Sequence, residues 1–354
     1  MAYDRTQSFA SACERNFRLY SDTVAVLSAI KKFFDDNPSY GRVVGIESVL
    51  GTSDGRRLTP DLSVALGISS GIAFEFKWSM PMNPDLVEKE IKEVTKYYDA
   101  KLGWRTATSS VDQVGVVLVC HADDCARVVS SLEDIMKGSG SQTLALGSFA
   151  IWTWDLVIDK EHRQEQLRIA HGYGRTMHES LNQRFETPGG VTTPEDVLRY
   201  LRYQYKFIKQ EPPVQYTIGV LAQNVLPTFQ TGPEREHYNI RIDWIYDYCS
   251  KLYPHWQALD EASKQIKRSW IVKALRMMVT LKFAESTEQK DTYRIRIPTI
   301  VSRRGRTLEE VICKRLARHL AKKEEEVRGP PGRVKRVILR PKTTDRRIKE
   351  FLSG

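Results

Sequence analysis

The chain has 354 residues and an ordinary apolar share of 41%, enough for two domains or for one large domain with appendages. It contains no run near the ~18 apolar residues of a membrane-spanning helix, and its first residues lack the charged-then-apolar order of a secretion signal. The five cysteines are scattered and form no CxxC pair, which indicates reduced thiols rather than disulfides or a zinc site. We therefore expect an intracellular protein, cytoplasmic or else associated with a nucleoid or nucleus, with no membrane partner.

The net charge of +10 is concentrated at the C-terminus. Residues 303–354 hold 17 of the 54 basic residues and 7 of the 44 acidic ones, so the rest of the chain is neutral. A block of positive charge predicts a polyanionic partner, with nucleic acid first. A solvated tail without a partner is the alternative, and the composition leaves both open.

Helical and strand periodicities alternate over the first 160 residues. Apolar residues recur every three or four positions in some segments, as in a helix with one buried face, and β-branched residues cluster in others. Helices are predicted over 8–36, 83–103 and 122–138, and strands over 42–50, 60–66, 71–78, 112–120 and 145–158. This order predicts an α/β (α+β) domain over 1–160, with a mixed central sheet flanked by helices.

The remainder of the chain changes character twice. Residues 161–193 are charged and then glycine-rich, and we predict a linker or lid there. Residues 194–302 are predicted to be helical, ending in a basic helix near 262–281 and two strands around a polar turn. The last part, 303–354, is a basic tail that combines an amphipathic helix over 308–326 with a segment whose composition is typical of disorder until binding.

The basic helix and the hairpin after it resemble the end of a winged helix-turn-helix domain. In that family the last helix enters the major groove of DNA and the hairpin contacts the backbone. The resemblance predicts a winged-helix-like, nucleic-acid-binding domain over 194–302, and a helical domain with solvated lysines is the alternative. The predicted contacts come from the basic helix and the start of the tail: Lys267, Arg268, Lys273, Arg276, Arg303, Arg304 and Arg306.

Two neighbouring predicted strands carry charged residues on one face. In the stretch TPDLSVALGISSGIAFEFKW (59–78), side chains alternate between faces, so Glu75 and Lys77 share a side of the second strand. A hairpin folded about Ser69 brings Asp61 of the first strand to them, since opposed or diagonal residues lie about 5–8 Å apart. The sequence thus predicts two acids and a lysine on one polar patch, backed by an apolar face.

Two carboxylates at that distance repel each other unless a proton or a cation compensates them. Mg²⁺ is the expected cation, because it prefers oxygen and takes one or two carboxylates together with water and substrate phosphates; Mn²⁺ can replace it. A lysine beside such a metal can orient water or stabilise charge on a phosphate. A surface ion pair is the alternative, although it does not require the second acid.

The pair Pro60-Asp61, followed fourteen residues later by Glu75-Phe76-Lys77, resembles the motif of the PD-(D/E)XK nuclease superfamily, which has a restriction-endonuclease-like fold with an αβββαβ core. The resemblance implies that Asp61 and Glu75 bind Mg²⁺ together with the Phe76 carbonyl. It also implies that Lys77 positions the attacking water or helps to deprotonate it.

The resemblance covers residues 8–158 and extends to further positions. The family often adds an acid from its first helix, for which Glu14 is the best match and Glu47 the alternative. Many members carry a Gln-x-x-x-Tyr pattern in the helix after the motif. This chain has Glu93 and Tyr97 there instead, a departure that leaves the roles of these two residues open.

Together these predictions favour a Mg²⁺-dependent nuclease that hydrolyses phosphodiester bonds, with double-stranded DNA as the expected partner and a homodimer as one expected arrangement. Restriction or defence, repair and mobile-element processing all stay open as pathways. One alternative is a non-catalytic DNA-binding protein that uses a nuclease-like scaffold. Another is an RNA-directed nuclease, since the aromatic and basic run at 200–209 could stack on single-stranded bases.

Overall fold

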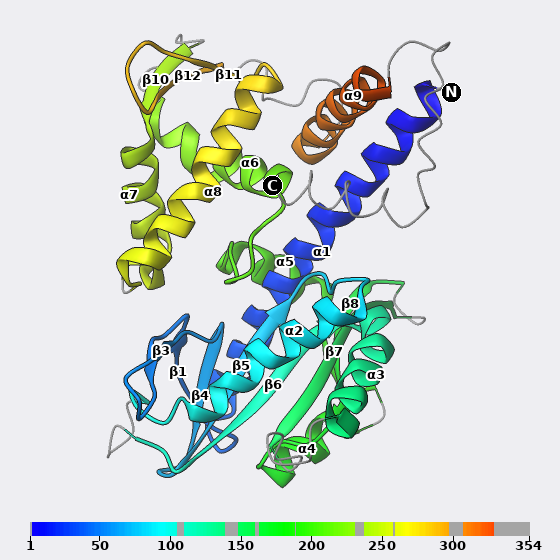
Figure 1. The fold of residues 1–354 in the computed structure, drawn as a ribbon, viewed down its shortest axis with the longest axis vertical. Coiled ribbons are helices and arrows are strands. Elements are labelled where there is room, and N and C mark those ends of the chain that lie inside the picture. The colour runs from blue at the N-terminus through cyan, green and yellow to red at the C-terminus, as the bar shows by residue number, and fades with distance from the viewer. Residues whose placement is uncertain are drawn as a thin grey trace. The chain divides into compact units, whose positions relative to one another are not determined.

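The protein forms two compact units in a computed structural model (Figure 1). The first unit is Ser21–Gln210, and the second combines residues 1–20 with residues 211–354. The boundary after Tyr20 falls inside the first helix, so one helix contributes to both units. The structure describes residues 2–104, 110–138, 148–159, 163–187, 189–230, 237–257, 259–296 and 307–328.

A seven-stranded mixed sheet forms the centre of the first unit. Its strands, in spatial order, are β1 (Arg42–Ile46), β4 (Leu62–Leu66), β5 (Ser70–Lys77), β6 (Gln113–His121), β7 (Phe149–Ile158), β8 (Glu165–Gly174) and β9 (Val191–Thr193). The first three pair antiparallel, β6 and β7 continue parallel to β5, and β8 and β9 return antiparallel. The central strands β4, β5 and β6 are buried almost throughout, which explains their nearly continuous apolar sequences.

One face of this sheet packs against α1 (Ala2–Asp36) and α4 (Glu179–Glu186). Phe74 of β5 meets Phe34 of α1 with ring centroids 5.9 Å apart. On the same face the Trp152 ring of β7 stacks on a phenylalanine of α4. These aromatic contacts form the apolar side of the β4–β5 hairpin.

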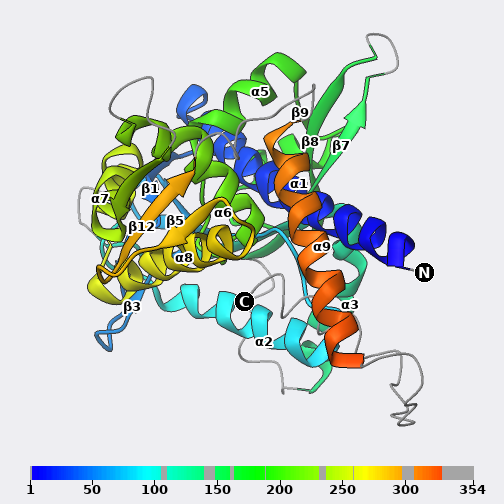
Figure 2. The same cartoon turned by 90° about the horizontal axis from the view of Figure 1, so that it is seen from above.

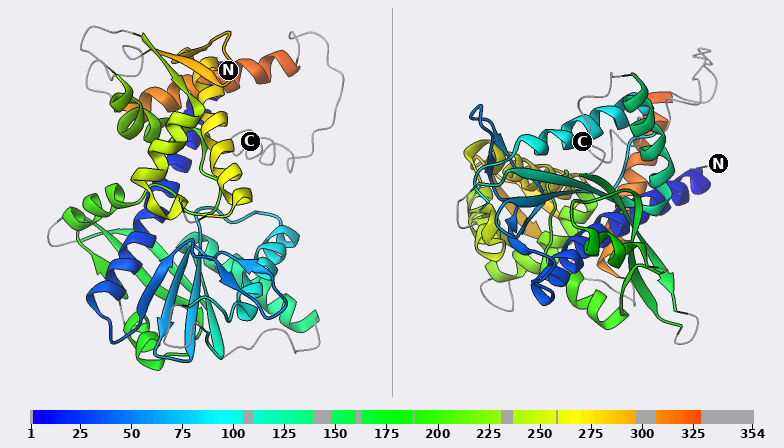
Figure 3. Two further views of the ribbon diagram at one scale, coloured as in Figure 1. Left: turned by 90° about the vertical axis from the view of Figure 1, so that its left-hand side faces the viewer. Right: turned by 90° about the horizontal axis from the view of Figure 1, so that it is seen from below.

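The other face carries α2 (Pro84–Thr95), its 3₁₀ continuation η1 (Lys96–Asp99) and α3 (Ala122–Gly138). In the right-hand view of Figure 3, α2 and α3 lie on the opposite side of the sheet from α1. The start of α2 is set locally, because the Asn83 side chain accepts the backbone N–H of Asp85 and proline fills the first helical position. The buried side of α2 consists of Val87, Ile91 and Val94. This face therefore supplies a second core as well as the helix that borders the charged residues.

Two glycines shape the β4–β5 hairpin. Gly67 in its turn has a φ of +66°, a conformation that residues with a Cβ adopt only at a cost. At Gly71 a Cβ atom would lie 2.4 Å from the Trp104 ring, so the indole packs directly on the strand backbone. A small ladder of β2 (Leu50–Gly51) and β3 (Arg57–Leu58) precedes the hairpin.

The chain returns to the sheet after α5 (Glu195–Gln204). Arg202 near the end of α5 binds Asp22 of α1 at 2.8 Å and Glu165 of β8 at 3.3 Å. These ion pairs hold α5 to the sheet unit. The residues that follow α5 then run to the end of β5, where the charged side chains lie.

The second unit is mainly helical with a small sheet. Its elements are the residues of α1 before Ser21, α6 (Val214–Val220), the π-turn Leu221–Val225, the 3₁₀ turns Leu226–Phe229 and Pro254–Trp256, β10 (His237–Arg241), α7 (Ile242–Leu252), α8 (Glu261–Thr280), β11 (Ala284–Ser286), β12 (Thr292–Arg296) and α9 (Leu308–Arg328). The sheet has the order β10-β12-β11 and is antiparallel. Figure 2 shows α9 against the first part of α1, where Arg18 lies 3.7 Å from Glu309.

The predicted mixed α/β architecture is confirmed, and the helices and strands expected up to residue 158 are present with shifted ends: the first helix begins at Ala2, and the strand expected over 42–50 ends at Ile46. The short strands β2 and β3 were not predicted. The prediction of a linker or lid over 161–193 is wrong, because β8, α4 and β9 lie there and extend the same sheet. The domain boundary at 160 is therefore also wrong, and the sheet unit continues to Gln210. The backbone pairing of β8 with β7 is a long-range contact that the irregular, glycine-containing sequence does not indicate.

The second unit differs from its prediction of 194–302 in its bounds and in one strand, since it starts at Glu211 and also includes residues 1–20. β10 was not predicted, and it pairs with β12 to complete the three-stranded sheet. The basic helix and the hairpin after it occur as α8, β11 and β12. Among the described helices, none is both long and apolar enough to cross a bilayer.

Candidate active site

The register of the hairpin places the two predicted acids next to each other. Leu62 pairs with Phe74, so Asp61 just before Leu62 is adjacent to Glu75 across the strands. Asp61, Glu75 and Lys77 are only 0%, 4% and 8% exposed. The prediction of a charged patch is thus borne out in position, but the patch is buried, because α2 and η1 cover this face as α1 covers the other.

Asp61 is held by two backbone donors from different parts of the chain. The N–H of Phe76 donates to Oδ2 at 2.8 Å, and the N–H of Lys209 donates to Oδ1 at 2.6 Å. The first bond ties the residue before the start of β4 to β5, just beyond the pair Leu62 and Phe74. The second ties the segment after α5 to the same carboxylate. Both oxygens of Asp61 are therefore oriented by the main chain rather than by a flexible side chain.

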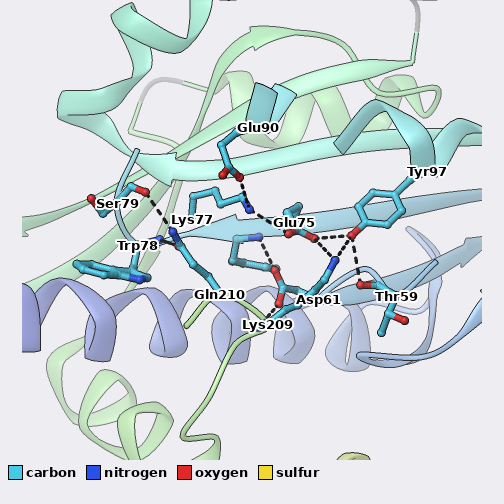
Figure 4. A network of polar contacts seen from close by, with 11 residues as sticks. Thr59, Asp61, Glu75, Lys77, Trp78, Ser79, Glu90, Tyr97, Lys209 and Gln210 are labelled. Carbon is cyan, nitrogen blue, oxygen red and sulfur yellow. Dashed lines mark hydrogen bonds and ion pairs between the residues drawn. The ribbon is translucent and has the colours of Figure 1, made fainter. Parts of the chain in front are cut away.

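Glu75 is surrounded by donors on its other sides (Figure 4). Its Oε1 lies 3.2 Å from the Lys77 ammonium, and its Oε2 accepts the Tyr97 hydroxyl at 2.7 Å. The Lys209 ammonium donates to the same tyrosine oxygen at 2.8 Å and lies 3.9 Å from Oε2. Lys77 reaches further to Glu90 of α2 at 2.8 Å. The result is a chain of alternating acids and bases from α2 to the segment after α5.

The charges in this cluster shift the protonation equilibria of the two acids in opposite directions. Burial and the charge of Glu75 raise the pKa of Asp61 to about 7, against the effect of its backbone hydrogen bonds. Burial alone would raise the pKa of Glu75, but the charges of Lys77 and Lys209 and the Tyr97 hydroxyl lower it. Near neutral pH the pair thus holds Glu75 ionised and Asp61 close to its titration point.

Of the two predicted candidates for the additional acid, Glu47 lies beside Asp61 within this unit. Glu47 is buried, its N–H donates to the Asp61 carbonyl at 3.0 Å, and its charge contributes to the raised pKa of Asp61. Its φ of 45° is uncommon for a residue with a side chain, and such backbone strain often occurs at functional sites. Glu14, the first choice from the sequence, belongs to the second unit, where its charge acts on Cys13 and Cys313.

The oxygens of this cluster suit a hard divalent cation such as Mg²⁺. No group of three or more His, Cys, Asp or Glu side chains is arranged as a metal cage in the described part of the chain. Mg²⁺ does not require one, since it often takes one or two carboxylates and fills its shell with water and phosphate. The Phe76 carbonyl points to the same side of β5 as the Phe76 N–H, which donates to Asp61. Asp61, Glu75 and this carbonyl are therefore the fitting donors.

Two residues at the edge of the cluster were not predicted. Lys209 contacts both acids, through its backbone and its side chain. Gln210 accepts the N–H of Trp78 at 3.0 Å and donates to the Ser79 carbonyl at 3.3 Å. The run at 200–209 was noted as aromatic and basic, but nothing in its spacing indicates that it returns to β5.

The helix after the motif contributes one of its two questioned residues. Tyr97 is buried and hydrogen-bonded to Glu75. Glu93 instead points outward and pairs with Lys96 at 2.7 Å. The departure from the Gln-x-x-x-Tyr pattern therefore falls on the residue outside the cluster.

The predicted nucleic-acid contacts on α8 have varied environments. Lys267 is 2% exposed, with its ammonium 4.1 Å from the Trp270 ring centre, so it is not available for a direct phosphate contact. Arg268 is paired with an aspartate and Lys273 with a glutamate, whereas Arg276 is exposed. The other three predicted contacts, Arg303, Arg304 and Arg306, lie outside the described residues.

Comparisons with known proteins place the chain in no group: no family model, no curated protein and no solved structure matches it.

Proposed function

We propose that the protein is a Mg²⁺-dependent phosphodiester hydrolase whose first unit cleaves nucleic acid, with double-stranded DNA as the expected substrate. The observation that carries the proposal is the meeting of Asp61, Glu75 and Lys77 in one buried cluster at the ends of two adjacent strands. Burying this many charges is costly for folding. A chemical role for the cluster is consistent with that cost.

The topology around the cluster supports the proposal. A helix, three antiparallel strands, a helix and a parallel strand follow each other as α1, β1, β4, β5, α2 and β6. With the short β2–β3 ladder left aside, this order is consistent with the αβββαβ core expected from the resemblance of Asp61 and Glu75-Phe76-Lys77 to the PD-(D/E)XK motif. Asp61 lies directly before the second of these strands, and Glu75 lies on the third.

The chain's own residues suggest how cleavage would proceed. Asp61 and Glu75 would hold the metal with the Phe76 carbonyl, and bound Mg²⁺ would supply a positive charge that polarises water and phosphate oxygen. The charges of Glu75 and Glu90 outweigh burial and raise the pKa of Lys77. Lys77 therefore stays protonated at neutral pH. It would orient water and stabilise negative charge on the phosphate rather than accept a proton.

The second unit supports nucleic acid as the substrate. The order α6, β10, α7, α8, β11 and β12, with an antiparallel β10-β12-β11 sheet, is consistent with a winged helix-turn-helix. In this reading α8 would be the groove-binding helix. Arg276 is the exposed basic residue of the predicted α8 set, and the basic tail would add phosphate contacts that give affinity without sequence preference.

A cleavage assay with the full chain tests the proposal. Plasmid, linear duplex, single-stranded DNA and RNA are each incubated with Mg²⁺ and with excess EDTA. We expect Mg²⁺-dependent cutting that Glu75→Gln lowers by about 10²-fold or more, with binding retained. Glu93→Gln is the matched control, since it neutralises an exposed glutamate outside the cluster. Cutting that persists in Glu75→Gln, or in EDTA, would contradict the assignment.

One observation favours a second candidate, a DNA-binding protein without catalysis. Each carboxylate oxygen of Asp61 and Glu75 already has an N–H, O–H or ammonium hydrogen-bond partner, so these oxygens are satisfied without a metal. Binding of duplex DNA with no cleavage of any nucleic acid in the same assay would support this candidate. Cleavage of RNA alone would instead favour the RNA-directed enzyme.

A further inference from the structure

The residues that follow α5 form a strap, defined here as residues 206–210, which is held to the sheet unit at both ends. Phe207 and Ile208 are buried. At the C-terminal end of the strap, the Gln210 side-chain amide is hydrogen-bonded to the backbone of Trp78 and Ser79. The main chain of the strap is therefore anchored independently of the Lys209 side chain.

Lys209 is the point at which the strap meets both acids. Its N–H donates to Asp61 at 2.6 Å, while its ammonium lies 3.9 Å from Oε2 of Glu75 and 2.8 Å from the Tyr97 hydroxyl oxygen. Figure 4 shows this side chain reaching across the carboxylates toward Tyr97. One residue thus supplies a fixed hydrogen bond to one acid and a positive charge to the other.

The two ammonium groups of the cluster differ in freedom. The Lys77 side chain is 10% exposed and lies between Glu75 and Glu90. The Lys209 side chain is 43% exposed, and its ammonium lies 3.9 Å from Glu75. Lys77 is thus enclosed by its two acidic partners, whereas the Lys209 ammonium reaches the cluster from a partly exposed position, where another cation could replace it.

We propose that the Lys209 ammonium is an internal counter-ion that competes with the divalent cation for Glu75, so that binding of the metal displaces it. The inference rests on the proposed metal site. A Mg²⁺ ion lies about 2.0–2.1 Å from its carboxylate ligands. Bound to Oε2 of Glu75, it would stand close to an ammonium that is itself 3.9 Å from that oxygen. Two cations at such a distance repel each other, the more so because Glu75 between them is buried.

The size of the effect follows from how ammonium groups act on carboxylates. A cation within ~4–6 Å shifts the proton affinity of an acid by about 1–3 pKa units. A divalent ion bound by the same carboxylate should lose affinity to the ammonium by at least the lower end of that range, about tenfold. Removing the Lys209 charge is therefore expected to tighten metal binding by about tenfold or more.

Calorimetric titration of the full chain with Mn²⁺, in the absence of nucleic acid, measures the affinity for the metal directly. We expect Lys209→Met to bind Mn²⁺ about tenfold more tightly than the native chain, and Lys209→Arg to stay close to native. Lys32→Met is the matched control, because the Lys32 side chain is 46% exposed and paired with Asp36 in α1. If the native chain binds Mn²⁺ in a way that depends on Asp61, but Lys209→Met binds it no more tightly, the proposed competition is wrong while the metal site stands.

The failure of the metal site gives a different result. If neither the native chain nor Lys209→Met binds Mn²⁺ in a way that Asp61→Asn abolishes, the metal site and this inference both fail. A variant that does not fold is replaced by Lys209→Gln.

A measurement on the native chain is independent of any substitution. Acetylation by acetic anhydride, read by mass spectrometry, is expected to be faster at Lys209 with Mn²⁺ than without, and unchanged at Lys32. An unchanged rate at Lys209 under saturating Mn²⁺ rules out its displacement.

Discussion

The two units of the molecule bury lysines in opposite ways. In the first unit Lys77 lies between Glu75 and Glu90, at 3.2 and 2.8 Å. In the second, Lys267 lies on aromatic rings, 4.1 Å from the centre of Trp270 and 5.7 Å from that of Trp256. Both side chains are almost fully buried. The same residue type is thus stabilised by full negative charges in one place and by ring quadrupoles in the other.

The second unit repeats this use of aromatic rings. The guanidinium of Arg268 lies 5.1 Å from the centre of the Tyr246 ring, and that of Arg315 lies 4.3 Å from the centre of Phe283. A ring attracts a cation without offering an oxygen ligand. Carboxylates attract cations of any kind, including metals. Burial of a lysine therefore does not by itself indicate a catalytic or metal-binding site. The groups that contact its ammonium, carboxylates or aromatic rings, distinguish the two cases.

The largest expected effect compares the two buried lysines directly. Lys77→Met leaves Glu75 and Glu90 without their shared cation, and breaking a buried pair in this way costs about 3–5 kcal/mol of unfolding free energy. Lys267→Met keeps the stem on the rings and loses a cation–π attraction of about 0.5–2 kcal/mol. Urea unfolding of both variants at pH 7.5 or so checks this. Equal losses would remove the distinction between the two sites.

The second prediction concerns pH and Asp61. Because the folded-state pKa of Asp61 is raised from 3.8 to about 7, its contribution to stability is complete below pH 3.8 and is lost as the pH rises through 7. Asp61→Asn removes this titration. It also leaves one of the two backbone N–H groups without an acceptor at every pH.

The variant should therefore gain about 2–3 kcal/mol relative to the native chain between pH 5 and pH 8 in EDTA. Urea unfolding at the two pH values measures the change. Asp134→Asn, at an exposed position, serves as the control and should show no such gain. A constant difference between Asp61→Asn and the native chain would mean that Asp61 does not titrate in this range.

A third, smaller effect is expected at Tyr97. Its hydroxyl joins Glu75, Lys209 and the Thr59 carbonyl. Tyr97→Phe keeps the buried ring and removes these bonds, so we expect a loss of about 1–2 kcal/mol in thermal or urea unfolding. Tyr200→Phe, at an exposed tyrosine of the same unit, should change stability by less than about 0.5 kcal/mol. Equal values would show that the hydroxyl network adds nothing.

The smallest effect tests whether the cations of the second unit act on nucleic acid at all. Arg276 is exposed on α8, so Arg276→Ala should weaken duplex binding and reduce the slope of log affinity against log salt by about 1. Lys267→Met should leave the slope unchanged, because its ammonium lies on rings rather than in solvent. An unchanged slope in Arg276→Ala would contradict the role proposed for α8.

Much of the site could be predicted from local sequence. Alternation along β4 and β5 is enough to put Asp61, Glu75 and Lys77 on one face, because side chains of a strand point to alternate sides. The turn with Gly67 then sets the register that makes the two acids neighbours. These relations depend on residues that are close in the chain, and they hold whatever the rest of the protein does.

Other features were decided by the tertiary structure. The hydrogen bond from the Glu47 N–H to the Asp61 carbonyl depends on the pairing of β1 with β4. The extension of the sheet by β8 and β9 depends on backbone hydrogen bonds between strands, and the residue types in these strands do not predict that pairing.

The strands of the hairpin, their charged face and the adjacency of the two acids could be predicted from the sequence, since short-range periodicity and turn geometry suffice for these. The burial of the cluster and the contacts of Lys209 with Asp61 and Glu75 are visible only in the folded chain. The contact of Lys209 with Asp61 and Glu75 joins residues more than a hundred positions apart. Such a contact arises from how α5 and the strap pack on the sheet, and this packing has no signature in the spacing of the residues that make it.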